Sequence, residues 1–147
     1  MKKRNIILFI ILLILILIFI YYQVINAQNK QKEIIKFNEE FEQYTNKEIY
    51  GTNIVTIINK AIDYNEKNKV SKNEKGYYID NKENSIIIEL EMINKENITT
   101  YKMEQISNLG IEKFLSSNFN LIYFKSTNIQ HHNNGRISKI VFTQIEN

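Results

Sequence analysis

The stretch that decides the fold of this chain is IILFIILLILILIFIYY, residues 6–22. None of these residues is charged, carries an amide or breaks a helix. At about 1.5 Å per helical residue the run is roughly 25 Å long, and continuing it through Ile25 approaches the roughly 30 Å hydrocarbon core of a bilayer. Because backbone polar groups in lipid must be satisfied within the segment, we expect a transmembrane helix over residues 6–25.

Seven residues spaced along the run mark the expected membrane anchor: Ile6, Phe9, Leu12, Leu15, Ile18, Tyr21 and Tyr22. The two tyrosines end the run where an aromatic belt would meet the membrane surface. A cleaved signal peptide is the alternative, with Ala27 at the −1 position and Ile25 at −3. Since the apolar part of a signal peptide is usually about 7–15 residues long and this run is longer, a retained anchor is favoured.

The residues that flank the run predict its orientation. Three basic residues precede it, whereas two lysines and a glutamate follow it closely: Lys2, Lys3 and Arg4 before it, and Lys30, Lys32 and Glu33 after it. An excess of Lys and Arg marks the cytoplasmic side of a span. We therefore expect residues 1–5 to be a cytoplasmic basic tail and residues 26–147 an extracytoplasmic domain of a single-pass protein in the cytoplasmic membrane.

Composition limits what the exposed part can be. The net charge of +3 resides in the first four residues, so the remainder is neutral overall and has no basic footprint for nucleic acid. The roughly 120 residues beyond the anchor suffice for one small domain. There is no Cys, so that domain must be held together by packing or by partners.

Two helical patterns follow the apolar run. The anchor helix is expected to continue to about Tyr44, because its later residues form one apolar stripe at helical spacing: Ile34, Phe37, Phe41 and Tyr44. This stripe either packs on the domain's own sheet, which is favoured, or makes a helix–helix contact between subunits. Beyond Gly51, a second helix capped by Thr52 or Asn53 should end near residues 65–68. Its apolar face comprises Ile54, Ile57, Ile58, Ala61 and Ile62.

From Gly76 onward the pattern is that of strands. Residues 77–79 and 85–93 predict one hairpin, and residues 119–127 and 137–145 predict another around the turn pair Asn134-Gly135. Alternation places one set of side chains on a core face: Ile86, Ile88, Leu90 and Met92.

Residues 99–108 fit either a short helix or a strand. The predicted fold class is α+β: a long N-terminal transmembrane helix that continues into a small domain with a second helix and a roughly four-stranded antiparallel sheet.

The sequence predicts no catalytic, cofactor-binding or metal-binding residue. His131 and His132 are adjacent, so on a strand they would point to opposite faces, and a turn position explains them better than a metal site. Glu89 and Glu91 share a strand face, where a carboxylate pair can perform acid–base chemistry if burial separates their pKa values. Because that face lies opposite the apolar one, a solvated surface is the favoured interpretation.

The segment FNEEFEQY at residues 37–44, followed by GTNIV at residues 51–55 and by Asn65, resembles a pattern in small single-span proteins of AT-rich Firmicutes. Some of those are similar to type IV pilin-like and pseudopilin subunits, and an anchor helix that leads into a small antiparallel sheet resembles their architecture. Residues 5–9, NIILF, depart from pilins in lacking the Gly-Phe-type processing site and the following Glu. The resemblance therefore implies architecture more than role.

These observations predict a membrane-anchored, non-enzymatic protein for interaction or assembly, possessing no cofactor. The resemblance implies a pilin-like or secretion-apparatus component. The expected partners are the lipid bilayer and either further copies of the chain or other proteins of a surface apparatus, with no nucleic acid. The alternative is a tethered ligand-binding domain, which would need an apolar cavity with a few convergent polar groups.

Overall fold

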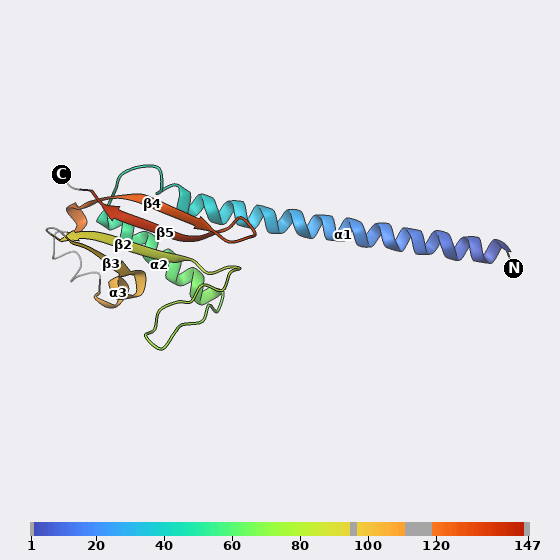
Figure 1. Cartoon of the computed structure of the whole chain (residues 1–147). Coiled ribbons are helices and arrows are strands. Elements are labelled where there is room, and N and C mark those ends of the chain that lie inside the picture. Colours follow the sequence, from blue (N-terminus) through green and yellow to red (C-terminus); the bar gives the residue numbers. More distant parts are fainter. Residues whose placement is uncertain (1, 95–96, 111–118, 146–147) are drawn as a thin grey trace. The chain divides into compact units, whose positions relative to one another are not determined.

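In the computed structural model, which describes residues 2–94, 97–110 and 119–145, the chain is an α+β protein that begins with a long apolar helix. This helix is α1, Lys2–Glu42. The chain divides into two compact units, Met1–Lys36 and Phe37–Asn147, so that the last turns of α1 belong to the second unit. Figure 1 shows α1 and the elements of the second unit, which is called the domain from here on.

Helix α1 is unbroken because its sequence contains nothing that interrupts a helix. Residues 2–42 include neither Gly nor Pro, the residues least compatible with a helix interior. At its end the chain tightens into turns, with the backbone N–H of Tyr44 donating to the Phe41 carbonyl at 3.0 Å and that of Thr45 donating to the Glu42 carbonyl at 3.0 Å. The predicted continuation of the helix beyond the apolar run is confirmed.

Helix α2, Gly51–Lys67, is amphipathic. At its start the backbone N–H of Tyr50 donates to Asn53 Oδ1 at 3.2 Å, and at its end the Asn68 amide donates to the Tyr64 carbonyl at 2.7 Å. The predicted apolar residues are buried or, for the last of them, half-buried: Ile54, Ile57, Ile58, Ala61 and Ile62. The second helix and its core-facing side are thus confirmed, whereas the predicted cap at Thr52 or Asn53 is wrong, because the helix already begins at Gly51 with Tyr50 at the N-cap position.

Within the described residues the sheet has five strands and not four: β1 (Ile49–Tyr50), β2 (Ile87–Asn94), β3 (Asn97–Lys102), β4 (Tyr123–His131) and β5 (Ile137–Gln144). Their order across the sheet is β1-β4-β5-β2-β3. Neighbouring strands are antiparallel except β2 and β5, which run parallel with Ile88 opposite Ile140 and Leu90 opposite Phe142. The predicted four-stranded antiparallel sheet is therefore wrong in strand number and in strand direction.

The parallel pair follows from packing between segments that are distant in sequence. The β4–β5 hairpin places β5 next to β2, where Ile140 and Phe142 join Ile88 and Leu90 in the core. All four side chains are completely buried, and removing this apolar surface from water favours the pairing. The alternation in the sequence predicts which side of β2 is buried, but it carries no information about the neighbouring strand.

The strand predicted over residues 77–79 is also wrong, because this segment lies outside the sheet. Tyr78 makes one isolated antiparallel bridge, to Lys72. The chain that follows is a loop closed by Asn81, whose Oδ1 accepts hydrogen bonds from three backbone N–H groups, those of Glu83, Asn84 and Ser85. Such side-chain bonds compete with strand pairing for the same N–H groups, so the hairpin expected here does not form.

Residues 99–108 contain both of the structures that the sequence left open. Strand β3 ends at Lys102, and helix α3, Met103–Asn108, begins at once. The backbone N–H of Lys102 donates to Gln105 Oε1 at 2.8 Å, which satisfies a group at the helix start. The sequence also favours helical structure beyond Gly110, up to residue 118, but residues 111–118 lie outside the described residues.

The 3₁₀ helix η1, Phe119–Leu121, occupies the start of a segment predicted as strand. It lies against the first residue of α2, where the Gly51 N–H donates to the Ile122 carbonyl at 3.0 Å. A Cβ atom at Gly51 would lie 2.1 Å from the Phe119 carbonyl oxygen. Only glycine fits this close approach, so Gly51 is required for the packing of η1 against the start of α2.

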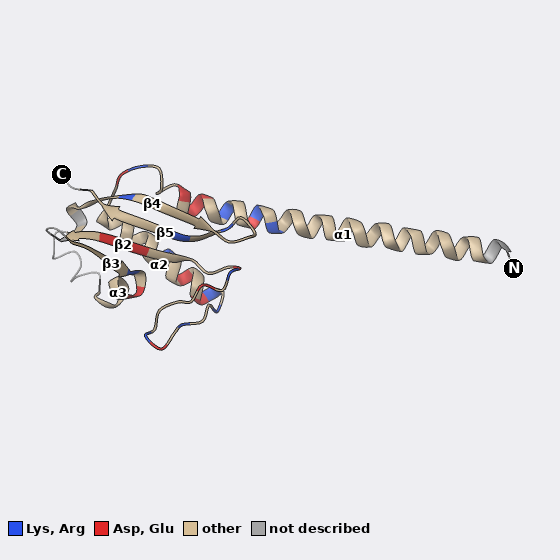
Figure 2. Cartoon of the chain, in the orientation of Figure 1, with Lys and Arg blue, Asp and Glu red and all other residues tan. Residues whose placement is uncertain are grey.

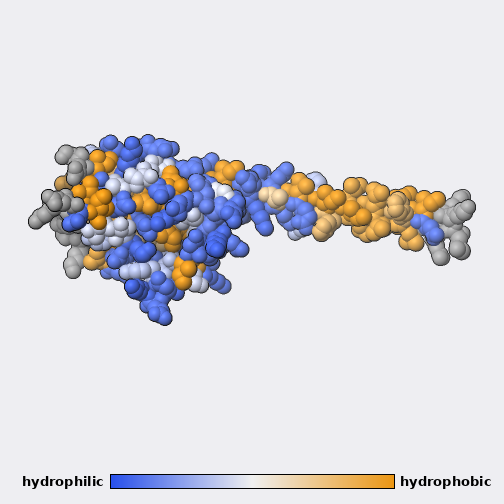
Figure 3. Space-filling model, viewed as in Figure 1, coloured by the Kyte–Doolittle hydropathy of each residue, from blue (hydrophilic) through white to orange (hydrophobic). Residues whose placement is uncertain are grey.

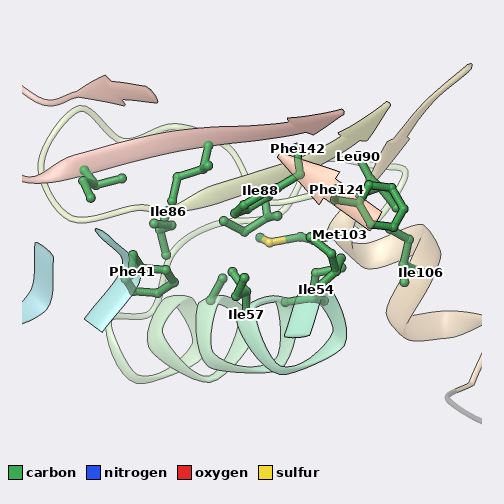
Figure 4. Packing of buried hydrophobic residues seen from close by; sticks show 14 of the residues in the cluster. Phe41, Ile54, Ile57, Ile86, Ile88, Leu90, Met103, Ile106, Phe124 and Phe142 are labelled. Atoms are coloured by element: carbon green, nitrogen blue, oxygen red, sulfur yellow. The ribbon is translucent and has the colours of Figure 1, made fainter. Parts of the chain in front are cut away.

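The core of the domain lies between the sheet and α2. Figure 4 shows Ile54 and Ile57 of α2 pointing toward Ile88 and Phe142 of the sheet, with Phe41 from the end of α1 in the same layer. These side chains are at most 1 % exposed. The described core residues therefore fill the space between the two layers.

Candidate functional site

The apolar part of α1 is the feature of this chain with the clearest functional meaning. In the part of the chain that the structure describes, α1 is the one helix long and apolar enough to cross a membrane; a signal sequence would meet the same criteria. Its large hydrophobic residues from Ile6 to Val24 are 46–68 % exposed, and Figure 3 shows an apolar surface along this part of the helix. No charged residue lies between Asn5 and Asn29, as Figure 2 also shows.

The structure brings the predicted anchor and topology residues into this one helix. The seven anchor residues belong to the exposed apolar surface: Ile6, Phe9, Leu12, Leu15, Ile18, Tyr21 and Tyr22. Lys2, Lys3 and Arg4 form the first turn of α1. A basic first turn thus leads directly into the apolar segment.

The stripe predicted at the end of the helix lies largely inside the protein. Ile34, in the first unit, is half-buried. Phe37 and Phe41 are only 3 % and 1 % exposed, with ring centroids 4.9 Å apart, and both belong to the core of the domain. Tyr44 packs on the edge of that core, with Lys60 Nζ 5.8 Å from its ring centroid. The two phenylalanines therefore contribute to packing within the domain.

Two asparagines join distant parts of the domain. The Asn38 amide donates to the Gly135 carbonyl at 2.9 Å and accepts from the Ile137 N–H at 2.9 Å. The Asn65 amide makes the same pair of bonds to the carbonyl and N–H of Ile86, at 2.7 and 2.9 Å. Each side chain thus replaces the partner that a strand backbone would provide. Both residues stand in the pattern that carries the pilin-like resemblance, but in so asparagine-rich a chain nothing local predicts this role.

Arg136, like the two asparagines, connects distant parts of the domain in a way that the sequence does not predict. Its guanidinium carbon lies 3.8 Å from the ring centroid of Phe37 and 4.3 Å from that of Tyr64. Those rings are themselves 4.4 Å apart in an edge-to-face arrangement. A cation over aromatic faces is stabilising, so this contact holds the end of α1, helix α2 and the β4–β5 hairpin together.

Asp80, Ser85 and His132 are residue types of a catalytic triad, but their geometry is structural. A triad requires the histidine to accept the hydroxyl proton of the serine. Here Ser85 Oγ donates to Asp80 Oδ1 at 2.8 Å, and His132 Nε2 lies 2.8 Å from the Ser85 carbonyl oxygen. His132 Nδ1 is 3.7 Å from Asp80 Oδ1. The three side chains attach the loop before β2 to the β4–β5 hairpin.

The same contacts explain the acidity of Asp80. Burial would raise the pKa of this carboxyl group. The Lys82 N–H, the Ser85 hydroxyl and the nearby His132 lower it by more, so that the pKa lies below its ordinary value. Asp80 is therefore held as a carboxylate that accepts hydrogen bonds.

Glu89 lies on the sheet face opposite the core and is paired twice. Its Oε2 is 2.7 Å from Lys139 Nζ, and its Oε1 is 3.3 Å from Lys102 Nζ. Burial would raise the pKa of Glu89, but the two lysines lower it below its ordinary value. Glu91 Oε2 accepts a hydrogen bond from the Thr143 hydroxyl at 2.7 Å. These partners make the two carboxylates part of a polar strand face.

The histidines and the surface depressions define no further site. His131 ends β4 and is exposed, whereas His132 is buried. Among the described residues no three His, Asp or Glu side chains are grouped so that they could hold a metal ion. A depression of about 210 Å³ beside the two histidines is open to solvent, as is one of about 290 Å³ between Lys60 and Tyr64. A third, of about 390 Å³, lies on the surface beside Tyr77 and Lys102.

No protein-family model, curated protein or solved structure matches this chain. Its class is defined by its own structure: an α+β protein with a long N-terminal apolar helix compatible with a membrane anchor.

Proposed function

We propose that this chain is a single-pass membrane protein whose domain is held on the outer face of the cytoplasmic membrane and acts there by interaction or assembly. The observation that carries the proposal is the exposed apolar surface of α1 over residues 6–24. In water such a surface is unfavourable and promotes association. In a bilayer it contacts lipid, and the helix satisfies its own backbone groups.

The flanking charges support an orientation with the N-terminus inside. Lys2, Lys3 and Arg4 stand directly before the apolar segment, whereas the lysines that follow it begin only at Lys30, five residues beyond Ile25, and have Glu33 among them. The basic residues adjacent to the span are the ones expected to stay in the cytoplasm. The domain then lies outside, where a chain without Cys is insensitive to oxidising conditions.

The polar clusters of the domain support a role in interaction over one in catalysis. Ser85 and His132 are buried and bonded to neighbouring groups, and Glu89 is paired with two lysines. An apolar helix that leads into a small α+β domain is also what the resemblance to pilin-like subunits implies. We therefore place the protein in a surface or secretion assembly, with copies of itself or with other proteins as partners.

Single-cysteine labelling tests the orientation directly, because the natural chain has no Cys. Asn133→Cys, in the exposed turn between β4 and β5, should react with a membrane-impermeant maleimide on intact cells. Asn5→Cys should react only after the membrane is permeabilised. The reverse result would show that the domain faces the cytoplasm, and equal labelling of both would show that the chain does not span the membrane.

Two further measurements test retention and assembly. The mass of the mature protein should include Met1, whereas loss of residues 1–27 would identify a cleaved signal peptide. Cross-linking in membranes followed by purification in mild detergent should recover the chain with a stoichiometric partner or with itself. Recovery of the monomer alone at native expression levels would contradict the assembly role.

A further inference from the structure

A collar of lysines follows the apolar segment on α1. It consists of Lys30, Lys32 and Lys36, all exposed, and residues 26–36 contain one acidic residue, Glu33. Because no charge precedes Lys30 back to Asn5, this collar is the first charged part of the chain beyond the span. The whole arrangement lies within the first compact unit.

The helix places the collar at the membrane surface. At about 1.5 Å per residue, Lys30 and Lys32 lie roughly 8 and 11 Å beyond Ile25, where the hydrocarbon should end. The headgroup layer on each side of a bilayer is roughly 5–8 Å thick. Since side chains on a helix lean toward its N-terminus, Lys30 and Lys32 lean back toward the bilayer, and their long stems bring the ammonium groups to the level of the lipid phosphates. Lys36 lies roughly 16 Å beyond Ile25, where it adds to the attraction only through the field that extends about a Debye length from the surface.

The three lysines surround the helix. Lys32 and Lys36 are four residues apart and share one side. With about 3.6 residues per turn, Lys30 lies roughly 160° around the axis from Lys32. Positive charge on opposite sides of a helix fits a ring of lipid headgroups, whereas a protein partner would meet one side.

We propose that this collar binds the anionic phospholipid headgroups of the outer leaflet and so sets the depth of the span in the membrane. The inference rests on the proposed function, since it requires α1 to be a span. The attraction is that between lysine ammonium groups and lipid phosphates, which acts within a Debye length of the surface.

The test compares lipids around the full-length protein reconstituted into phosphatidylcholine vesicles. Spin-labelled phosphatidylglycerol and spin-labelled phosphatidylcholine are added separately, and electron paramagnetic resonance measures the fraction of each that is immobilised by the protein. The variant K30Q/K32Q/K36Q is compared with K47Q/K75Q/K125Q, which removes three exposed lysines from the domain. Lys2, Lys3 and Arg4 remain in every variant, so their effect on the other leaflet is constant.

The natural chain should prefer phosphatidylglycerol at low salt, and the collar variant should lose about twofold or more of that preference. The domain variant should keep it, and high salt should reduce it in the natural chain. An unchanged preference in the collar variant, with lipid still immobilised, would overturn this inference and leave the span intact. A chain that immobilises neither lipid would overturn the proposed function and this inference together.

Discussion

The side chain of Asn65 exchanges two hydrogen bonds with the backbone of Ile86: its Nδ2 donates to the carbonyl at 2.7 Å, and its Oδ1 accepts from the N–H at 2.9 Å. Both residues are completely buried. The pair joins the end of α2 to the chain just before β2. Without the amide, two backbone groups would lack partners where water does not reach them.

Asn65→Ala should therefore lower the free energy of unfolding by about 2–6 kcal/mol, because two buried backbone groups are left unsatisfied at about 1–3 kcal/mol each. Urea titration of the detergent-solubilised chain, followed by near-ultraviolet circular dichroism of its tyrosines, measures the change. Asn59→Ala is the matched control, since Asn59 is exposed on the same helix. It should be neutral or slightly stabilising because Ala favours helices. Similar losses in both variants would contradict the role assigned to Asn65.

Gly51→Ala should destabilise the domain although the residue begins a helix, where Ala is normally preferred. The added Cβ would lie 2.1 Å from the Phe119 carbonyl oxygen and 2.5 Å from its ring. Relieving that clash requires η1 to shift, which costs about 1–3 kcal/mol. Thr52→Ala, at the next and exposed position, serves as the control. A melting temperature for Gly51→Ala equal to that of the control would show that η1 can shift to accommodate the Cβ atom without a cost in stability.

Arg136→Lys should destabilise the domain even though it keeps the charge. The planar guanidinium lies against both the Phe37 and the Tyr64 ring, and a lysine ammonium cannot contact both rings in this way. We expect a loss of about 1–2 kcal/mol in thermal or urea unfolding. Lys125→Arg, at an exposed position of β4, exchanges the same two residue types and should have little effect. Full stability of Arg136→Lys would show that charge alone suffices at this junction.

Acid should weaken the domain through Glu89. Its pKa in the folded protein lies below the ordinary 4.5, so the unfolded chain binds the proton more readily. The stabilisation is therefore fully present above about pH 4.5 and is lost as the pH falls through the folded pKa. Glu89→Gln should lose less stability than the natural chain between about pH 6 and pH 3. Glu48→Gln, at an exposed position, should lose as much stability as the natural chain when the pH falls. If Glu89→Gln also loses as much as the natural chain, Glu89 is not the cause of the loss of stability in acid.

Features with a short period could be predicted from the sequence. Helix α2 and the buried side of β2 follow from apolar residues spaced every three to four or every two positions, which a few neighbouring residues establish. The β4–β5 hairpin follows from its Asn134-Gly135 turn. The helical spacing of Phe37 and Phe41 favours packing within the domain, and their exposed fractions of 3 % and 1 % agree with it.

The contacts that connect distant parts of the domain could not be predicted in the same way. Asn38, Asn65 and Arg136 act on groups that are far away in the sequence, and no local pattern separates them from the many other polar residues. The segment after Tyr78 forms a loop and not the predicted hairpin, because Asn81 Oδ1 accepts hydrogen bonds from backbone N–H groups that a strand would use.

By itself the sequence determined that the chain begins with a long apolar helix and that an amphipathic helix and apolar strands follow, because composition and periodicity act over a few residues. Only the tertiary structure decided that β2 lies parallel to β5 and that Asn65 serves as a strand partner for Ile86. Strand neighbours are selected by which apolar faces meet in the core. A side-chain amide acquires its role only from the backbone group that folding places opposite it.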